Sequence, residues 1–396
     1  MGSLLIDTAN KKRCFCNLIS VVALLCIVFF VGSAFVTIDY KEKVSTWEAA
    51  NSVQISQTNS KSKTKLNIQT AQSNLCKSQS KPAGSEPLPK GIISQTSNFE
   101  MQPLWGSPKR KGNTKSSKSL LAIPVGIRQK EVVNQIVTKF PPNYFMVMLF
   151  HYDGVVDEWR DLQWSDSALH ISAINQTKWW FAKRFLHPDI VAEYNYIFLW
   201  DEDLEVENFH PLTYLSIIKR EGLEISQPAL DISKSEVHHR ITARLRKGAV
   251  HRRIYKFTGG GRCYENSTAP PCTGWVEMMA PVFSRAAWRC AWHMIQNDLI
   301  HAWGLDRKLG YCAQGDRSKN VGVVDSEYIV HKGIPTLGGV DEKKVHPRSP
   351  TFNDRFAVRK RSYVELEIFR KRWQMAVKED KCWIDPYPEP SENSSH

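Results

Sequence analysis

Three consecutive carboxylates, Asp201, Glu202 and Asp203, directly follow an apolar run that begins at Tyr194. Aromatic and β-branched residues in such a run are typical of a buried strand, and open α/β sheets bind ligands just beyond the carboxyl ends of their strands. Because side chains alternate along an extended chain, we expect Asp201 and Asp203 on one side and Glu202 on the other. The two aspartates can then share Mg²⁺ or Mn²⁺, with positions left open for phosphate oxygens. The alternative is a solvated strand end or an acidic cap for the next helix.

Two later segments also carry groups suited to acid–base or metal chemistry. Residues 301–306 are expected to open a helix at Asp306, and residues 321–325 are expected to form a strand that ends in Asp325. Residues 328–333 then place His331 at the end of another strand. A lone histidine is usually structural, but its position at a strand end makes it a candidate ligand.

The elements that must position these residues alternate between strand and helix from residue 119 onward. Strands are predicted over residues 120–125, 144–150, 168–174, 196–200, 223–230 and 275–283, and helices over residues 130–139, 177–186, 211–220, 237–250, 285–296 and 356–377. We therefore expect an α/β domain with a central, mostly parallel sheet flanked by helices. The sequence has no GxGxxG or Walker pattern after the first strand, which argues against an NAD-dependent or P-loop enzyme.

The N-terminus carries a charge-free segment, residues 18–38, preceded by Lys11, Lys12 and Arg13. This segment is long enough to cross a bilayer, and the cationic flank orients the N-terminus to the cytosol. We expect residues 1–17 to be a cytosolic tail and residues 18–38 a signal anchor of a single-pass type II protein. A cleaved signal peptide is the alternative, although its apolar region is usually shorter.

Residues 39–118 are rich in small polar residues, lysine and proline, so we expect a flexible stem. They hold 13 Lys and Arg against 5 Asp and Glu, so most of the chain's formal charge of +13 belongs to the tether. A nucleic-acid-binding protein would concentrate its basic residues on the folded domain, and we therefore expect no nucleic-acid partner.

The cysteines and glycosylation sequons agree with a lumenal location. Cys263 and Cys272 bracket a short loop and are candidates for a disulfide, but sequence does not reveal the connectivity of the six cysteines beyond the anchor. Sequons begin at Asn175, Asn266 and Asn393.

Four segments, taken in order, carry a resemblance to a known family: Leu199-Trp200-Asp201-Glu202-Asp203, Ser226-Gln227-Pro228-Ala229-Leu230, Trp303-Gly304-Leu305-Asp306, and Val324-Asp325 through His331. They resemble the plant family called domain of unknown function 707, often labelled lysine-ketoglutarate-reductase trans-splicing-related. The resemblance covers residues 119–386 and leaves residues 387–396 as a loose tail. In fold it extends to A-type glycosyltransferases, in which an acid-x-acid motif after a central strand binds a divalent metal on a nucleotide-sugar diphosphate.

This resemblance implies roles for particular residues. Asp203 would bind Mn²⁺ or Mg²⁺ directly, Asp201 would assist through a metal-bound water or the donor ribose, and His331 would be the third protein ligand. Asp306 would take the proton of the acceptor hydroxyl, with Asp325 in reserve.

Further expectations concern the two substrates. Gly126, Arg128 and Asp153 would hold the nucleotide, and Lys183 would reach a phosphate. Trp275 and Glu277 would line the acceptor side.

The predicted function is a metal-dependent glycosyltransferase of the Golgi membrane that moves a sugar, hexosyl or pentosyl, from a nucleotide sugar to a glycan or glycoprotein. The endoplasmic reticulum and plasma membrane are alternative locations. Two other functions stay open: a catalytically silent lumenal binding or scaffold module, and a metal-dependent hydrolase. The sequence does not indicate an oligomeric state.

Overall fold

The computed structural model describes residue 76 and residues 81–93, 118–255, 263–334 and 351–388, which belong to one compact unit from Leu75 to His396. The predicted tail and anchor, residues 1–38, and the terminal residues 389–396 lie outside the described residues, as does most of the predicted stem. Within the described ranges, no helix has both the length and the apolar character needed to cross a membrane.

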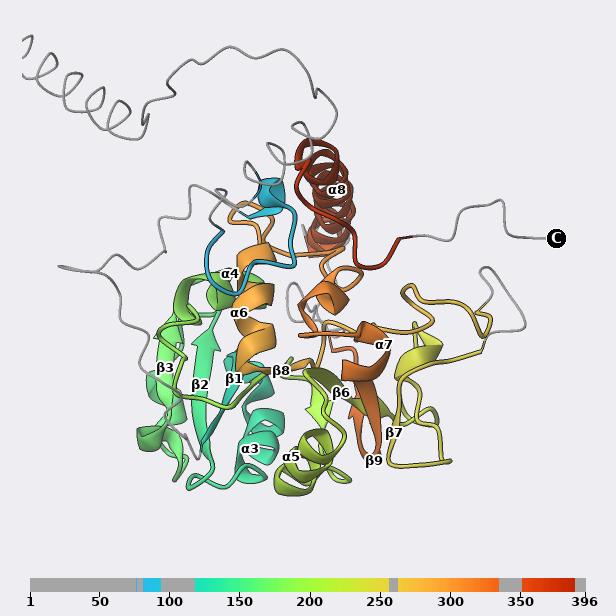
Figure 1. The fold of residues 1–396 in the computed structure, drawn as a ribbon. Coiled ribbons are helices and arrows are strands. Elements are labelled where there is room, and N and C mark those ends of the chain that lie inside the picture. The colour runs from blue at the N-terminus through green and yellow to red at the C-terminus, as the bar shows by residue number, and fades with distance from the viewer. Residues whose placement is uncertain (1–75, 77–80, 94–117, 256–262, 335–350, 389–396) are drawn as a thin grey trace, which may run out of the picture. The chain divides into compact units, whose positions relative to one another are not determined.

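The described part of the chain contains a nine-stranded sheet with the order β3-β2-β1-β4-β8-β6-β9-β5, and β7 also pairs with β9 (Figure 1). The strands are β1 (Ser119–Val125), β2 (Phe145–His151), β3 (Leu169–Ser172), β4 (Tyr196–Leu199), β5 (Leu204–Glu205), β6 (Ile225–Leu230), β7 (Val250–His251), β8 (Val282–Ser284) and β9 (Val321–His331).

The sheet is mixed, which corrects the prediction of a mostly parallel one. Strands β3, β2, β1 and β4 are parallel to one another, as the alternating first half of the sequence predicted. Strand β8 is inserted between β4 and β6 and is antiparallel to both. The chain approaches β8 from the carboxyl edge of the sheet, where Met279 O accepts a hydrogen bond from Asp201 N, so β8 must run back across the sheet.

Helices lie against both faces of this sheet. The α-helices are α3 (Lys130–Thr138), α4 (Lys178–Phe185), α5 (Pro211–Arg220), α6 (Arg285–Met294), α7 (Arg317–Asn320) and α8 (Thr351–Glu379). Short 3₁₀ helices are η1 (Lys90–Ile92), η2 (Ile127–Gln129), η3 (Asp157–Trp159), η4 (Ser165–Ser167), η5 (Arg240–Thr242) and η6 (Leu309–Cys312). The helix predicted over residues 237–250 is wrong, because only η5 and β7 form there.

Strand β1 shows how the sequence divides the core between the two faces. Leu120 and Ala122 pack into one buried cluster with apolar residues of α4, α6 and α8. Leu121 and Ile123 pack into a second cluster with residues of α3 and α5. Successive side chains of β1 point to opposite faces of the sheet, and helices cover both faces. For this reason nearly every residue of β1 is apolar, as in strands buried on both sides.

Strand β9 is one continuous strand rather than the two separate strands expected at residues 321–325 and 328–333. Its register with β6 shifts where Pro228 pairs with Val324 and Ala229 pairs with Tyr328. Proline has no N–H to donate to a neighbouring strand, so a bulge next to Pro228 avoids a missing ladder bond. Asp325 therefore lies in the bulge and not at a strand end.

The folded part begins earlier than residue 119, because residues 81–93, named the strap here, pack on the domain. Leu88 and Ile92 are fully buried in the same core cluster as α6 and α8, and Figure 1 shows the strap in blue between these helices. This segment was predicted to belong to the stem, since its composition is poor in large apolar residues.

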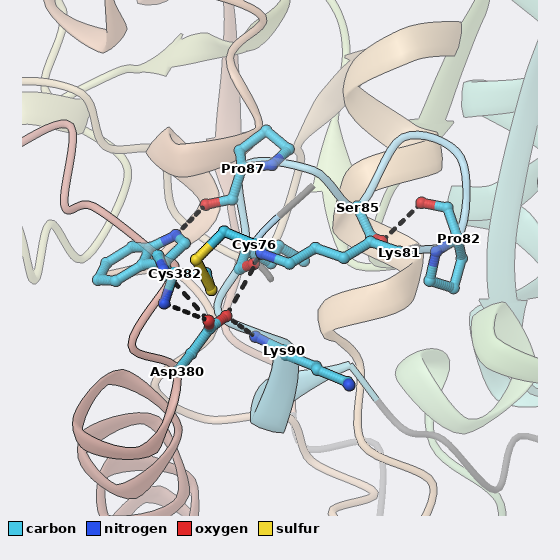
Figure 2. Close-up of polar contacts among 10 residues, drawn as sticks. Cys76, Lys81, Pro82, Ser85, Pro87, Lys90, Asp380 and Cys382 are labelled. Atoms are coloured by element: carbon cyan, nitrogen blue, oxygen red, sulfur yellow. Dashed lines mark hydrogen bonds and ion pairs between the residues drawn. A yellow bond between two sulfur atoms is a disulfide. The ribbon is translucent and has the colours of Figure 1, made fainter. Parts of the chain in front are cut away.

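The strap, and Cys76 ahead of it in the sequence, are also tied to the segment that follows α8 (Figure 2). A disulfide joins Cys76 to Cys382, the Lys90 N–H donates to Asp380 Oδ2 at 2.8 Å, and the Trp383 indole donates to Pro87 O at 2.8 Å. Two further disulfides join cysteines among the described residues. Cys263 bonds to Cys272, as the loop length suggested, and Cys290 bonds to Cys312.

Candidate metal and substrate site

The acidic residues follow β4 in a short bend before β5. Strand β4 ends at Leu199, and the Asp201 N–H donates to Met279 O at 2.7 Å. Asp203 O accepts from Lys332 N at 3.1 Å, and Asp203 Oδ2 accepts from Ile334 N at 2.8 Å. These backbone contacts on both sides fix the bend, so the direction of each carboxylate is determined by the sheet.

His331 reaches this bend through strand pairing. The last residue of β9, His331, pairs with Leu204 of β5, the residue after Asp203. His331 Nε2 lies 3.5 Å from Asp203 Oδ2. Burial alone would lower the pKa of His331, but the carboxylates of Asp203, Asp201 and Glu277 outweigh it and raise that pKa.

Asp201, Asp203 and His331 thus come together as the sequence predicted, each with one ligand atom within 4.8 Å of the others. Opposite ligands of an octahedral Mg²⁺ or Mn²⁺ at about 2.1 Å are about 4.2 Å apart, so a shift of a few tenths of an ångström would suffice. Two carboxylates and an imidazole suit Mn²⁺ well and Mg²⁺ acceptably. The residues therefore fit a divalent cation.

Lys178, at the first position of α4, supplies a positive charge that was not foreseen. Its Nζ lies 2.5 Å from Asp201 Oδ1 and 2.5 Å from Met278 O, and its side chain is only 8% exposed. Burial raises the pKa of Asp201, while the Lys178 ammonium acts against this rise. Because Lys178 occupies Oδ1, it leaves Asp201 Oδ2 for another ligand.

Lys183, the lysine expected to reach a phosphate, is placed elsewhere. It lies in the interior between α4 and α6, where its Nζ donates to Trp292 O at 2.8 Å and sits 3.7 Å from the Trp292 ring. Its side chain is 1% exposed, so it has no access to a phosphate in solution. Lys178 is the lysine of this site.

Glu202 turns away from the two aspartates, as alternation predicted. It is buried, and the Tyr152 hydroxyl donates to its Oε1 at 2.9 Å. Burial, followed by the charge of Asp201, raises the pKa of Glu202 to about 8. Glu202 is therefore mostly protonated at neutral pH in the absence of a cation, which lowers the negative charge of the bend.

The three residues expected to hold the nucleotide lie at the ends of β1 and β2. A side chain at Gly126 would meet the Tyr152 ring, with its Cβ only 2.6 Å from the hydroxyl, so this glycine makes room for the tyrosine that contacts Glu202. Asp153 Oδ2 accepts from Ile127 N at 2.6 Å and thereby joins the two strand ends. Arg128 is exposed on η2.

A second pair of acids, Asp306 and Glu277, lies near the cluster. The charges of His331, Asp306 and Asp201 all act on the Glu277 carboxyl, whose pKa is raised to about 7, chiefly by burial. Its Oε2 is buried, and no described residue hydrogen-bonds to it. Asp306 lies in a turn instead of opening a helix, and its Oδ2 accepts from the Trp275 indole at 3.3 Å. Burial raises the pKa of Asp306 as well.

Asp325, the reserve acid, is engaged elsewhere. Its Oδ1 accepts from Leu245 N at 2.5 Å, and its Oδ2 lies 2.7 Å from His251 Nδ1 of β7. With its side chain only 3% exposed, Asp325 holds the loop before β7 onto the bulge of β9. The structure does not bring it to the acidic cluster.

Sequence reasoning missed Lys178 and gave Glu277 only a lining role. A lysine in the first turn of a helix that follows a strand end was a usable signal, since such turns face the carboxyl edge of the sheet. Glu277 had no such signal, because its place depends on the loop that turns into β8.

A family model described as "Protein of unknown function (DUF707)" matches residues 79–379, about three quarters of the chain. The match begins at the strap rather than at β1. No curated protein matches the sequence.

Several solved structures of glycosyltransferases and related proteins are loosely similar. TarS 1–349 of S. aureus, also solved in complex with UDP, has a TM-score of 0.35 at 10% identity, and the match covers 54% of this chain and 59% of TarS 1–349. The glycosyltransferase GlyE of Streptococcus pneumoniae TIGR4 has a TM-score of 0.31 at 12% identity, with 66% and 63% covered. The bifunctional WbbM has a TM-score of 0.30 at 9% identity, with 69% and 46% covered. Scores of this size carry no information about the chemistry of this chain, which must come from its own residues.

Proposed function

This chain belongs to the DUF707 family, and we propose that it is a metal-dependent glycosyltransferase acting on a nucleotide-sugar donor and a glycan or glycoprotein acceptor. One observation carries the proposal: Asp201, Asp203 and His331 converge at the carboxyl edge of the sheet, beside Lys178. Such an edge is where open α/β sheets bind ligands. Asp201 and Asp203 also fit the acid-x-acid motif expected from the resemblance of the sequence to A-type glycosyltransferases.

The chain's residues have distinct tasks in this proposal. Asp203 and His331 would hold Mn²⁺ or Mg²⁺, and Asp201 would complete the set with the oxygen that Lys178 leaves open. The bound cation would neutralise the negative charge that develops on the diphosphate leaving group. Lys178 keeps Asp201 oriented, and Glu202 points away from the two aspartates to accept from the Tyr152 hydroxyl.

On the acceptor side, one carboxylate must take the proton of the attacking hydroxyl if the sugar carbon is inverted. The bond from that carbon to the diphosphate breaks, the bond to the acceptor oxygen forms, and the proton moves to the base. Asp306 is the residue expected from the sequence, but Glu277 is better suited. Its pKa of about 7 is close to the optimum for a general base, and its Oε2 has no partner among the described residues.

The experiment is donor binding by the purified full-length chain in detergent. Nucleotide sugars with uridine, guanosine and cytidine bases are titrated calorimetrically with and without Mn²⁺. We expect one donor class to bind only with Mn²⁺, and the binding to disappear in Asp203→Ala. Absence of binding by every donor to folded protein would refute the transferase and favour a silent binding module.

The hydrolase alternative is separated by product analysis. A hydrolase releases free sugar from the donor at a rate that an acceptor does not reduce, whereas a transferase moves the sugar to the acceptor.

We also propose that residues 18–38 anchor the protein in the Golgi membrane with residues 39–396 in the lumen. The charge-free segment and its cationic flank support this topology, and the disulfides between Cys76 and Cys382 and between Cys290 and Cys312 suit an oxidising compartment. A protease-protection assay on sealed Golgi vesicles with a C-terminal tag tests it. A tag digested without detergent would exclude the lumenal orientation.

A further inference from the structure

A cavity of about 740 Å³ lies where the strap, the residues around η6 and the segment after α8 meet. The aromatic residues in its wall are Tyr311, Trp383 and Tyr387, and Glu86 and Asp316 are among its polar residues. Its volume is within the range of sites that bind small organic ligands. None of its lining residues belongs to the metal and substrate site.

The three rings are fixed by their polar ends. The Tyr311 hydroxyl lies 3.1 Å from Asp385 Oδ1, the Trp383 indole donates to Pro87 O at 2.8 Å, and the Tyr387 hydroxyl donates to Gly315 O at 2.7 Å. Tyr311 is only 7% exposed and packs on the rings of Trp383 and Tyr387. The carbon surface that the wall offers to a ligand therefore belongs to the half-buried rings of Trp383 and Tyr387.

Covalent bonds hold the same wall. Cys382 lines the cavity next to Trp383 and is bonded to Cys76, and Figure 2 shows this disulfide beside Pro87 and Asp380. Cys312, adjacent to Tyr311, is bonded to Cys290 of α6. A wall held in place before binding loses little conformational entropy when a ligand arrives, which favours affinity.

The chemistry of the wall suits a carbohydrate without charge. Fixed aromatic faces pack against the C–H faces of pyranose rings, and carboxylates accept hydrogen bonds from sugar hydroxyls. Glu86 is exposed at the cavity. The lining lysine, Lys81, donates to Leu88 O at 2.6 Å, and its charge is paired with Asp380 Oδ2 at 3.5 Å, in the segment after α8. Asp316 lies 3.8 Å from Lys319 Nζ, so the exposed Glu86 is the lining carboxylate that would repel an anionic chain.

We propose that this cavity is a second, non-catalytic binding site for a neutral oligosaccharide. Asp316 and Gly315 lie just before α7, which leads into the first residue of β9, whereas His331 is the last residue of that strand. An 11-residue strand spans roughly 30 Å at about 3.3 Å per residue. The site therefore holds a glycan at the edge of the sheet opposite the acidic cluster, and this binding does not depend on the transfer activity.

The test is calorimetric titration of the full-length chain with cellohexaose, xylohexaose and hexagalacturonate. At least one neutral hexasaccharide should bind, and the anionic hexagalacturonate should bind at least tenfold more weakly. Tyr387→Ala should weaken binding of the neutral chain at least tenfold. Tyr387→Phe keeps the ring and loses the hydroxyl, so its affinity should stay within about threefold of wild type.

Two further variants make the test independent of folding and of the transfer site. Glu86→Gln changes an exposed residue and should weaken binding without lowering the melting temperature. Asp203→Ala disrupts the acidic cluster and should leave hexasaccharide binding unchanged. The proposal is overturned if none of the three chains binds, if only hexagalacturonate binds, or if binding is lost in Asp203→Ala but kept in Tyr387→Ala.

Discussion

His331 Nε2 lies 3.5 Å from Asp203 Oδ2 because the residue after Asp203 pairs with His331 across two strands. The contact is built by the backbone ladder between β5 and β9, not by proximity in sequence. The same pairing lets Lys332 N donate to Asp203 O. The histidine and the aspartate are thus held at a fixed separation before any cation arrives, which reduces the cost of assembling a metal site.

Replacing Asp203 with Asn should weaken Mn²⁺ binding at least about 100-fold, because a neutral amide is a much poorer ligand for a hard cation than a carboxylate. Electron paramagnetic resonance of free Mn²⁺ in a titration measures this directly. Glu205→Gln is the matched control, because Glu205 is an acid of the adjacent β5 that pairs with Lys332 at 2.7 Å and lies outside the cluster. Equal losses in the two variants would show that general negative charge, and not this cluster, attracts the ion.

Replacing Lys178 with Met should destabilise the metal-free protein by about 1–3 kcal/mol, since Asp201 then lacks a counter-charge next to Asp203. Mn²⁺ should restore most of that loss, because the cation compensates the same carboxylates. Urea unfolding with EDTA and with Mn²⁺ measures both values.

Lys183→Met is the control for the Lys178→Met experiment. Its ammonium is buried against the Trp292 ring and donates to Trp292 O. Its effect on the free energy of unfolding should therefore be the same with EDTA and with Mn²⁺. Rescue of Lys183→Met by Mn²⁺ would contradict the assignment of Lys178 as the lysine of the site.

Glu277→Gln should lower kcat by about 10²- to 10⁴-fold if Glu277 is the general base. Wild-type kcat/KM, which reports ionisations of the free protein, should rise with pH through about 7, the pKa of Glu277, because only the ionised carboxylate accepts a proton. The residual rate of the variant should lack this rise. Asp306→Asn is the comparison, and a larger loss of kcat there would return the role of base to Asp306.

Glu277→Gln should also change how the free energy of unfolding depends on pH. The pKa of Glu277 is raised in the folded protein from 4.5 to about 7, so its stabilising contribution is fully present below pH 4.5 and is lost as pH rises through 7. Glu277→Gln cannot ionise, and it should become more stable relative to wild type between pH 5 and 8, by about 2.5 kcal/mol. Thermal unfolding in EDTA at several pH values checks this, and a difference that is constant with pH would contradict it.

Replacing Cys76 and Cys382 together with Ala should cost about 5 kcal/mol, because this disulfide closes a loop with a sequence separation of 306. Removing the Cys263–Cys272 disulfide, with a separation of 9, should cost about 2.5 kcal/mol. Urea unfolding of the full-length variants ranks the two. Equal losses of unfolding free energy in the two variants would mean that the Cys76–Cys382 disulfide restrains the chain no more than the short Cys263–Cys272 loop does.

Some of the site was predictable from local sequence. The apolar run before Asp201 identified the strand end, and period-two alternation separated Asp201 and Asp203 from Glu202, which the structure turns toward Tyr152. His331 was found because its own strand is strongly apolar. Each of these inferences depends on a pattern within a few neighbouring residues.

Other features were predicted wrongly or missed because they depend on contacts between residues that are far apart in the sequence. Lys178 and Lys183 lie on the same short helix, and which of them meets Asp201 depends on how α4 lies against α6. The direction of β8 is not encoded in its apolar residues, since parallel and antiparallel strands can bury the same side chains. Leu88 and Ile92 look isolated in a polar segment, yet the core between α6 and α8 buries both.

The sequence by itself determined the alternation of strands and helices, the acidic strand end, the candidate histidine and the charge-free N-terminal segment, because each is a local consequence of residue type and spacing. Only the tertiary structure decided the mixed sheet, the place of Lys178 and Glu277 beside the cluster, the engagement of Asp325 by His251, and the closure of the strap onto the end of α8. These features arise from backbone pairing and burial between residues far apart in the chain, and such contacts are selected by the packing of the whole domain.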